Sequence, residues 1–235
     1  MGLWGQVFAA GYDRWMASTE KECLSLHRAG LLANVLGRVL EIGGGTGANL
    51  EFYDRRVAEL VIAEPREPMT RRLERKLRAY PIPTRVIRAP AEELPVESET
   101  FDWVVSTLVL CTVEDPLRAL GEVRRVLKPT GRLLFIEHVR SEDPKLARWQ
   151  DRLRAPWALF GYGCQCNRAT TDTMRAAGFS VTELHRGDLA KAVPIVRPFA
   201  VGTATRPLSP GPAGGTRCTD AVARRDGGAS STALG

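Results

Sequence analysis

The chain has 235 residues, of which 44% are hydrophobic, and carries a formal net charge of +6. It is long enough to bury one sizeable core, and no apolar run approaches the roughly 20 residues of a membrane-spanning helix. The basic residues are spread along the chain rather than gathered in one stripe, so nucleic-acid binding is not indicated. The five cysteines lack framework spacing, so we expect a cytoplasmic protein without a metal site.

The apolar pattern alternates between strand and helix along most of the chain, which predicts an α/β fold. A helical N-terminal stretch covers about 7–36. Strands are predicted near 38–42, 60–63, 84–88, 101–106, 132–138, 180–185 and 199–205. Helices between the strands are predicted near 66–79 and 116–127.

The expected organisation is a helical cap over 1–37, one α/β domain over 38–206 and a tail over 207–235. From Pro207 onward, glycine, proline, serine, threonine and alanine dominate, with almost no large apolar side chain. Such a segment cannot offset its own ordering entropy, so the sequence predicts that the tail is disordered.

The most informative motif is the segment 39–47, Val-Leu-Glu-Ile-Gly-Gly-Gly-Thr-Gly. It predicts a buried strand that runs into a turn whose backbone lies against a ligand, since only glycine lets the main chain approach that closely. The next predicted strand ends in Glu64, about 20 residues after Gly45, where a carboxylate can accept both hydroxyls of a ribose. The two strand ends therefore predict a nucleoside cofactor.

Glu41 discriminates between two classes of cofactor. The segment 43–48 fits the dinucleotide pattern, but a carboxylate beside a pyrophosphate would repel it. S-adenosylmethionine carries no phosphate and presents an ammonium and a sulfonium. Acidic side chains around its pocket, such as Glu41, Glu64 and Glu92, are therefore compatible with its binding or strengthen it. These residues favour a methyl donor over a nicotinamide.

Apolar residues recur at three- and four-residue intervals between residues 141 and 160, with lysine and arginine beside them, which predicts an amphipathic helix. Pro156 is expected to kink or break this helix near its end. Packing against the domain is the first interpretation, and a lid or a peripheral membrane contact is the alternative. An apolar wall of this kind favours a small hydrophobic or lipid-like acceptor.

Together these blocks resemble the class I S-adenosylmethionine-dependent methyltransferases over about residues 8–206. Further similarity to the thiol methyltransferase group with a type 11 methyltransferase domain is carried by 106–113, 137–139, 163–168 and 196–198. The resemblance implies a doubly wound, Rossmann-like sheet of seven mostly parallel strands with an antiparallel last strand. It also implies S-adenosylmethionine as methyl donor and a small-molecule acceptor, with a thiol as first candidate.

The resemblance further implies a set of cofactor-binding residues at the strand ends. Those implied at the methionine end are Glu41, Gly43, Gly45, Gly47 and Asn49, which opens the following helix. Those implied around ribose and adenine are Glu64, Pro65, Met69, Ala91 and Glu92. Those implied beside the methyl-bearing sulfur or closing over it are Thr107, Leu108 and Tyr12.

Several of these positions have a simpler interpretation. Glu41 can cap the turn after its strand, and Tyr12 and Met69 can be packing residues of their helices. Many relatives have an aspartate where Pro90 stands, so main chain near Ala91 would have to meet the adenine amine instead.

His138 is the candidate catalytic residue, because it alone of the three histidines lies at the carboxyl end of a central strand. His138 could take a proton from the acceptor or orient the acceptor. An equally good interpretation is that His138 only makes a hydrogen bond to a neighbouring loop. A sulfonium is already a good leaving group, so alignment and desolvation matter more than a protein base.

Other functions stay open at this point. The acceptor could be a lipid amine or a quinone-like carbon instead of a thiol. The domain could also be a nicotinamide-dependent reductase, or a cofactor-binding module without turnover. The oligomeric state is not predicted.

Overall fold

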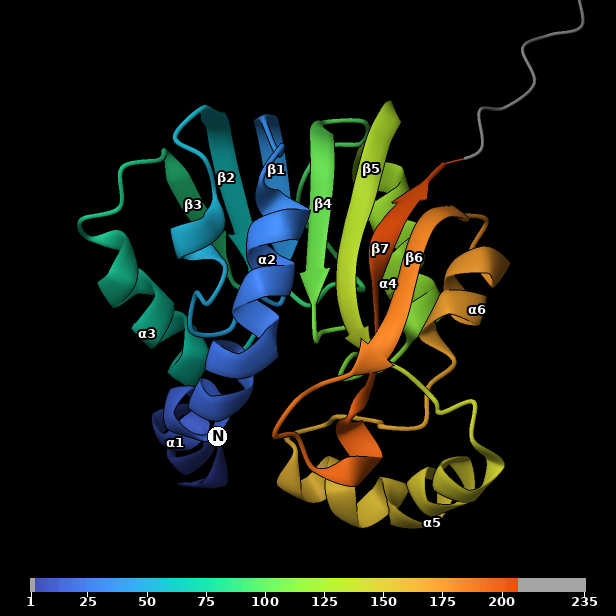
Figure 1. Cartoon of the computed structure of the whole chain (residues 1–235). Helices are drawn as coiled ribbons and strands as arrows, with labels where there is room; N and C mark the ends of the chain where they lie inside the picture. The colour runs from blue at the N-terminus through green and yellow to red at the C-terminus, as the bar shows by residue number, and fades with distance from the viewer. Residues whose placement is uncertain (1–2, 207–235) are drawn as a thin grey trace, which may run out of the picture.

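A seven-stranded sheet runs through residues 3–206, the part of the chain that this computed structural model describes. The strands are β1 (Gly37–Ile42), β2 (Val57–Ala63), β3 (Thr84–Ile87), β4 (Phe101–Thr107), β5 (Leu127–His138), β6 (Ser180–Asp188) and β7 (Pro198–Thr205). Their order is β3-β2-β1-β4-β5-β7-β6, and β7 runs antiparallel to β5 and β6 (Figure 1). The predicted doubly wound, mostly parallel sheet is confirmed. The predicted tail over 207–235 lies outside the described residues.

Helices cover the two faces of this sheet, which is why its central strands are continuous runs of valine, leucine and isoleucine. One core contains Leu40 and Ile42 of β1 together with side chains of α4 (Pro116–Val126) and α6 (Thr170–Ala176). Val39, which points the other way, belongs to a second core with α2 (Ser25–Leu32) and α3 (Glu67–Leu77). Alternate residues of one strand therefore fill two separate cores.

Two helices lie beyond the sheet, at the end where its parallel strands finish (Figure 1). The first is α1 (Leu3–Thr19), which a π-helical turn at Glu20–Leu24 joins to α2. The second is α5 (Pro144–Phe160), which the sequence predicted as an amphipathic helix. Among the described helices, none combines the length and apolar character needed to cross a bilayer.

The structure corrects two predicted details. Strand β5 begins at Leu127 instead of near 132, because a bulge beside Phe101 lets Leu127 pair with β4. Helix α5 is not broken at Pro156 but continues to Phe160, where Gly161 follows as its C-cap. The carbonyl of Arg152 loses the hydrogen bond that an N–H at position 156 would give, and because both residues are exposed, water can hydrogen-bond this carbonyl instead.

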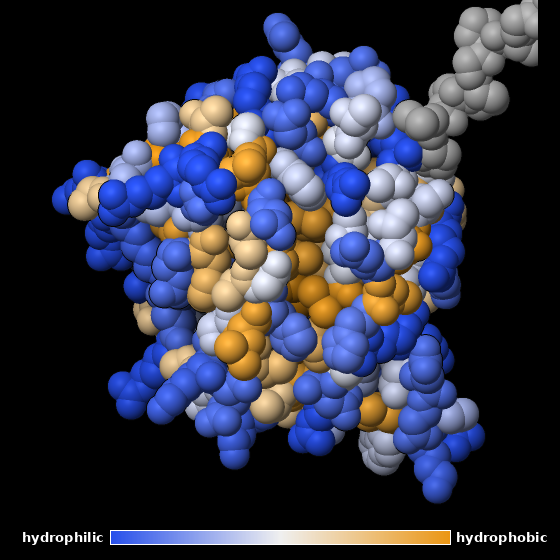
Figure 2. Space-filling view, turned by 45° about the horizontal axis from the view of Figure 1, so that its top comes forward, coloured by the Kyte–Doolittle hydropathy of each residue, from blue (hydrophilic) through white to orange (hydrophobic). Residues whose placement is uncertain are grey.

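The face of the sheet that α2 covers is only partly shielded. A hollow there lies between α2 and the strands β4 to β6, and Figure 2 shows apolar side chains gathered near the middle of this face. His27 of α2 stacks on His185 of β6 across it, with ring centroids 6.2 Å apart.

Candidate active site

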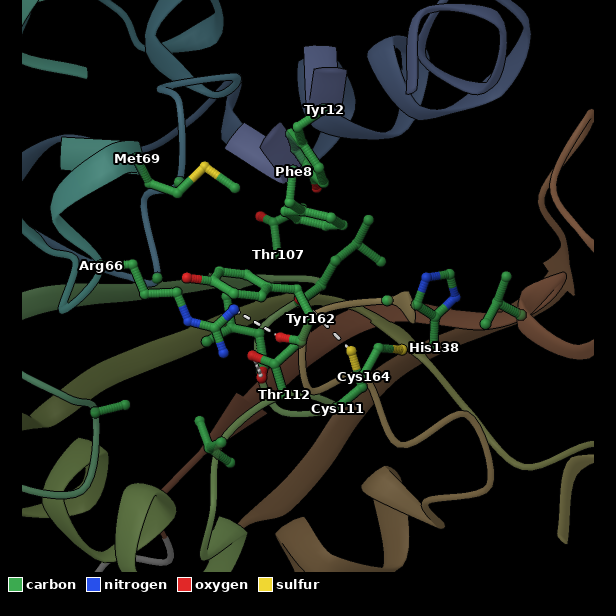
Figure 3. A pocket seen from close by; sticks show the side chains of 18 of the residues that line it. Phe8, Tyr12, Arg66, Met69, Thr107, Cys111, Thr112, His138, Tyr162 and Cys164 are labelled. Atoms are coloured by element: carbon green, nitrogen blue, oxygen red, sulfur yellow. Dashed lines mark hydrogen bonds between the residues drawn. The ribbon is translucent and has the colours of Figure 1, made fainter. Parts of the chain in front are cut away.

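A cavity of about 550 Å³ lies at the carboxyl ends of the parallel strands, between α1 and the end of α5. The chain order in the sheet reverses between β1 and β4, and doubly wound folds bind their ligands at this switch point. Figure 3 shows Phe8 and Tyr12 reaching it from α1, with Arg66 and Met69 on one side and His138 on the other. The cavity therefore lies at the strand ends to which the sequence analysis assigned the cofactor site, and that assignment stays a prediction.

Most of the predicted site residues line this cavity. They are Tyr12, Gly43, Gly45, Glu64, Pro65, Met69, Ala91, Glu92, Thr107, Leu108 and His138. Glu41, Gly47 and Asn49 do not line it. The structure thus divides the predicted residues into a group at the cavity surface and a group behind it.

The glycines of the loop after β1 have different reasons for being glycine. Gly45 has a φ of 55°, and a Cβ built there would meet only the carbonyl oxygen of Gly43, at 3.9 Å. Gly47 has a φ of 80°, and a Cβ there would lie 2.8 Å from Leu50 and 2.9 Å from Leu73. Gly45 thus leaves open space toward the cavity, whereas Gly47 allows the loop to pack on the core.

Glu64, at the end of β2, is buried against this loop. Its Oε2 accepts the N–H of Gly45 at 2.8 Å, and its Oε1 accepts the N–H of Arg66 at 2.9 Å. Burial raises the pKa of Glu64, and the two amides oppose that rise. Each carboxylate oxygen retains a second lone pair, which fits the pair of hydroxyls on a ribose.

Glu41 lies behind the cavity wall in a buried hydrogen-bond network. It accepts the hydroxyl of Tyr53 at 2.7 Å and the side-chain amide of Asn49 at 3.1 Å. Asn49 also donates to Thr107 at 3.0 Å, so the loop after β1 is tied to the end of β4. Burial raises the pKa of Glu41 to about 7, against the bonds from Tyr53 and Asn49 and the charge of Arg28. The geometry matches the simpler interpretation, in which Glu41 fixes the turn.

The helix expected after Asn49 is only a 3-10 turn, Leu50–Phe52. Asn49 precedes it but does not cap it with its side chain, because that side chain serves the network instead. The N-terminus of a long helix therefore does not face the cavity at this loop.

Arg28 is a functional candidate that the sequence did not reveal. This buried arginine of α2 donates to Asn49 at 2.6 Å and to Glu20 at 2.8 and 3.1 Å. It thereby connects the N-terminal helices to the cofactor loop. Glu20 lies eight residues away across the π-helical turn, a spacing that no regular helix pattern signals.

Aromatic side chains from α1 and α5 form the wall opposite the sheet. Trp15 contacts Trp157 and Phe160, with ring centroids 6.1 and 5.5 Å apart. The ring of Phe8 lies 4.9 Å from that of Tyr162. The guanidinium of Arg66 sits 3.8 Å from the Tyr162 centroid and donates to its carbonyl, so Tyr162 bridges the two sides of the cavity (Figure 3).

The loop after β4 is held in a strained conformation beside the cavity. Leu108 has a φ of 58°, which is unfavourable for a branched side chain. Glu137 stabilises the loop by accepting the N–H groups of Val109 and Leu110, both at 3.1 Å, and the hydroxyl of Ser106 at 2.6 Å. Burial raises the pKa of Glu137 to about 7. Sequence reasoning had assigned Glu137 no function.

His138 lines the cavity from the end of β5 and is almost fully buried. Its Nδ1 has no hydrogen-bond partner among the described residues. Burial lowers the pKa of His138 to about 4, against a contact with the backbone of Val196. At neutral pH the imidazole is uncharged, so it can orient a partner but holds an extra proton poorly.

Cys111 and Cys164 lie side by side at the cavity floor (Figure 3). The N–H of Gln165, the residue after Cys164, donates to the carbonyl of Cys111 at 2.7 Å, and this bond holds the two cysteine-bearing segments together. Hydrogen bonding to Cys164 and burial raise the pKa of the Cys111 thiol, and the same bond lowers that of Cys164. Among the described residues, no cluster suited to a metal ion is present.

The site has the features that a nucleoside methyl donor requires. Open space beside Gly45 allows close approach to the main chain, and Glu64 offers its carboxylate to a ribose. Met69 and Ala91 supply an apolar surface for a base. The donor set thus fits S-adenosylmethionine, although the individual contacts remain predictions.

Comparison with known proteins agrees with this site. Residues 40–135 match the family model of a methyltransferase domain. Thiol S-methyltransferase TMT1B of Homo sapiens is 34% identical over 180 residues, which cover 74% of this chain and 72% of the relative. Thiol S-methyltransferase TMT1A of Homo sapiens is 30% identical over 223 residues, which cover 88% of this chain and 90% of the relative.

Among solved structures, a similar one is a SAM-dependent methyltransferase of Thermotoga maritima, titled a possible histamine N-methyltransferase. It superposes with a TM-score of 0.66 and 25% sequence identity, over 88% of this chain and all of that one. The relatives and the fold agree on the cofactor and on the type of reaction. The chain therefore belongs to the class I S-adenosylmethionine-dependent methyltransferases, in the methyltransferase-domain group that includes the thiol S-methyltransferases.

Proposed function

We propose that this enzyme transfers the methyl group of S-adenosylmethionine to the sulfur of a small apolar thiol. The observation that carries the proposal is the weakness of the available base. His138 is the histidine at the cavity, and burial lowers its pKa to about 4. An acceptor in this site must therefore react without a strong protein base. Sulfur suits such a site, because thiols are intrinsically very nucleophilic and the cysteine thiol already ionises with a reference pKa of about 8.5.

The part of the cavity beyond Leu108 supports an apolar acceptor. Its wall is built by α1, the end of α5 and the segment after β6. The apolar and aromatic residues there are Phe8, Trp15, Met16, Trp157, Leu189, Ala192, Val193 and Val196. Such a surface excludes water from the reacting atoms and selects acceptors by size and hydrophobicity.

The side chains of the site would bind and align rather than exchange protons. Glu64, fixed by the amide of Gly45, would hold the ribose side of the donor, which supplies an electrophilic methyl group when bound. Glu137 would keep the loop after β4 in place, so that Thr107 and Leu108 lie next to the reacting sulfur atoms. The neutral Nδ1 of His138 would accept the S–H of the arriving thiol and orient it; the thiol then loses this proton to solvent, and its sulfur takes the methyl group as the sulfonium bond breaks.

An amine acceptor fits this site less well. A primary amine arrives protonated at neutral pH and must lose that proton before it can attack. The neutral, weakly basic imidazole of His138 cannot hold such a proton. Of the acids that line the cavity, Glu64 and Glu92 already accept backbone amides. A lipid amine is therefore disfavoured, and a quinone-like carbon is kept as an outcome of the test.

The test compares acceptors of one carbon skeleton that differ only in the attacking atom. The purified full chain is incubated with S-adenosylmethionine and hexanethiol, hexylamine or hexanol, with a short-chain quinol as a further arm. Methylated product and S-adenosylhomocysteine are measured by mass spectrometry. We expect turnover of the thiol alone. Turnover of the amine or the quinol without the thiol would overturn the proposal.

A further inference from the structure

Large apolar side chains are exposed on α5, on α1 and in the segment after β6, the elements that build the acceptor part of the cavity. On α5 these are Trp149, Leu153, Leu159 and Phe160, on α1 they are Val7 and Trp15, and after β6 the residue is Val193. Leu159 is 78% exposed and Trp149 53% exposed. We call this set the rim face. A patch of this kind on a protein surface marks a site of contact with another molecule or with a membrane.

The rim face is continuous with the acceptor part of the cavity. Trp15 and Val193 are exposed and also line the cavity, so they stand at its mouth. Trp15 packs against Phe160, which connects the mouth to the outer surface of α5. Figure 1 shows α1 and α5 together at this end of the molecule. Whatever covers the rim face therefore also faces the entrance of the acceptor.

Helix α5 carries an excess of positive charge beside its apolar residues. Its exposed cations are Lys145, Arg148, Arg152 and Arg154. Its one acidic residue, Asp151, is neutralised by the guanidinium of Arg140. The two acids just before the helix are also engaged, since Asp143 caps its first turn and Glu142 lies 3.3 Å from Arg186. The Arg152 guanidinium lies 5.6 Å from the ring of Trp149.

This pattern discriminates between two occupants. A second copy related by a two-fold axis would bring the cations of α5 close to the same cations of its partner, with no exposed, unpaired acid on the helix to offset them. Anionic phospholipid would instead attract those cations, while tryptophan and phenylalanine enter the headgroup region. Charge complementarity thus favours a lipid surface.

We propose that the rim face docks on an anionic lipid surface, so that a hydrophobic acceptor passes from the bilayer into the cavity at Trp15 and Val193. This inference rests on the proposed function only for the nature of the acceptor. Docking itself depends on the exposed residues of α1 and α5. The two parts can therefore be tested separately.

Docking is tested by co-sedimentation of the full chain with vesicles of phosphatidylcholine, with or without about 30% phosphatidylglycerol. We expect strong binding to the anionic vesicles alone, weakened at high salt. The double variant Trp149→Ser/Leu153→Ser should reduce binding at least about tenfold, and Arg148→Gln/Arg152→Gln should reduce it as well. Leu36→Ser is the matched control, because Leu36 is exposed at the opposite end of the sheet, before β1.

Two further measurements separate this inference from the proposed function. Gel filtration reports the oligomeric state. Docking on lipid would be overturned if the native chain did not bind vesicles but formed a dimer, and if Trp149→Ser/Leu153→Ser dissociated that dimer. Methylation is then measured with a short soluble thiol and with a long-chain thiol held in vesicles. The double variant should retain the first rate and lose most of the second. If the double variant kept both rates, delivery of the acceptor from the bilayer would be overturned. If the native chain methylated no thiol at all, only the proposed function would be contradicted.

Discussion

The carboxylate of Glu41 accepts a hydrogen bond from the side chain of Asn49, 3.1 Å away, behind the cavity wall. Through Asn49 this buried acid is connected to Thr107 on β4 and to Arg28 on α2. The loop after β1, which we propose meets the methyl donor, is thus fixed from three directions. Of these residues only Thr107 lines the cavity, so the geometry of the loop also depends on Glu41, Asn49 and Arg28, which lie behind its wall.

Replacing Asn49 by alanine should weaken both folding and donor binding. The variant leaves Glu41 and Arg28 buried with fewer partners, so we expect a loss of about 2 kcal/mol in the free energy of unfolding. Urea denaturation measures this loss, and calorimetry with S-adenosylhomocysteine should show weaker binding. Asn34→Ala is the control, because Asn34 is exposed. An Asn49→Ala protein as stable as the native chain would contradict the structural role of the network.

The parts of this site that were predictable from sequence are those determined by local geometry. A strand that ends in glycine, followed by a second strand that ends in Glu64, places both ends at one edge of a parallel sheet. The cavity position of Gly45 and Glu64 follows from that rule. The amphipathic pattern of α5 was likewise visible in the spacing of its apolar residues.

The remaining features depend on contacts between distant segments. Arg28 reaches Asn49 across 21 residues, and Glu137 accepts amides of a loop 27 and 28 residues earlier. Neither contact has a periodic signature. Of the two outcomes predicted for Pro156, a kink or a break, the break is wrong, because α5 continues through this exposed position to Phe160.

The buried acid Glu137 should make stability depend on pH. Its pKa is raised to about 7 in the folded protein from about 4.5 in the unfolded chain, so the folded state binds the proton more tightly. The stabilisation is complete below pH 4.5 and is lost as the pH rises to 7. The loss amounts to about 3 kcal/mol at most.

Glu137→Gln tests this pH dependence, because the amide keeps an acceptor oxygen but does not titrate. We expect the stability of the variant, relative to the native chain, to increase between pH 5 and pH 8. Urea unfolding of both proteins across this range measures the difference. His138 has the opposite dependence, since its lowered pKa destabilises the fold as the pH falls from 6.5 toward 4. Both proteins contain His138, so its contribution cancels in the difference between their stabilities. A constant difference between the two proteins would contradict the raised pKa.

Removing the imidazole of His138 should have a modest effect on thiol methylation. A neutral side chain that only orients the acceptor contributes little to proton transfer, so His138→Ala should lower kcat/KM about tenfold or less. His138→Asn should recover part of that loss, because its amide oxygen can still accept a hydrogen bond. In all three proteins the pH profile should follow the pKa of the thiol. Loss of turnover by a factor of about 1,000 would instead identify His138 as an essential base.

Gly45 and Gly47 should respond differently to the same substitution. Both have positive φ angles, so alanine is strained at either position. Gly45→Ala places a methyl group in the open space beside the loop, and we expect a fold weakened by only about 1 kcal/mol but donor binding weakened at least about tenfold. Gly47→Ala forces the methyl group against Leu50 and Leu73, so its main effect should be on unfolding, by about 2 kcal/mol or more.

Thermal unfolding with and without S-adenosylhomocysteine separates the two effects. The unfolding temperature of the Gly45→Ala protein should be close to that of the native chain, and S-adenosylhomocysteine should raise it only slightly. The Gly47→Ala protein should unfold at a lower temperature and still be stabilised by it. If Gly45→Ala bound the ligand as tightly as the native chain, the main chain at Gly45 would not lie against the donor, and the cofactor would have to sit elsewhere in the cavity.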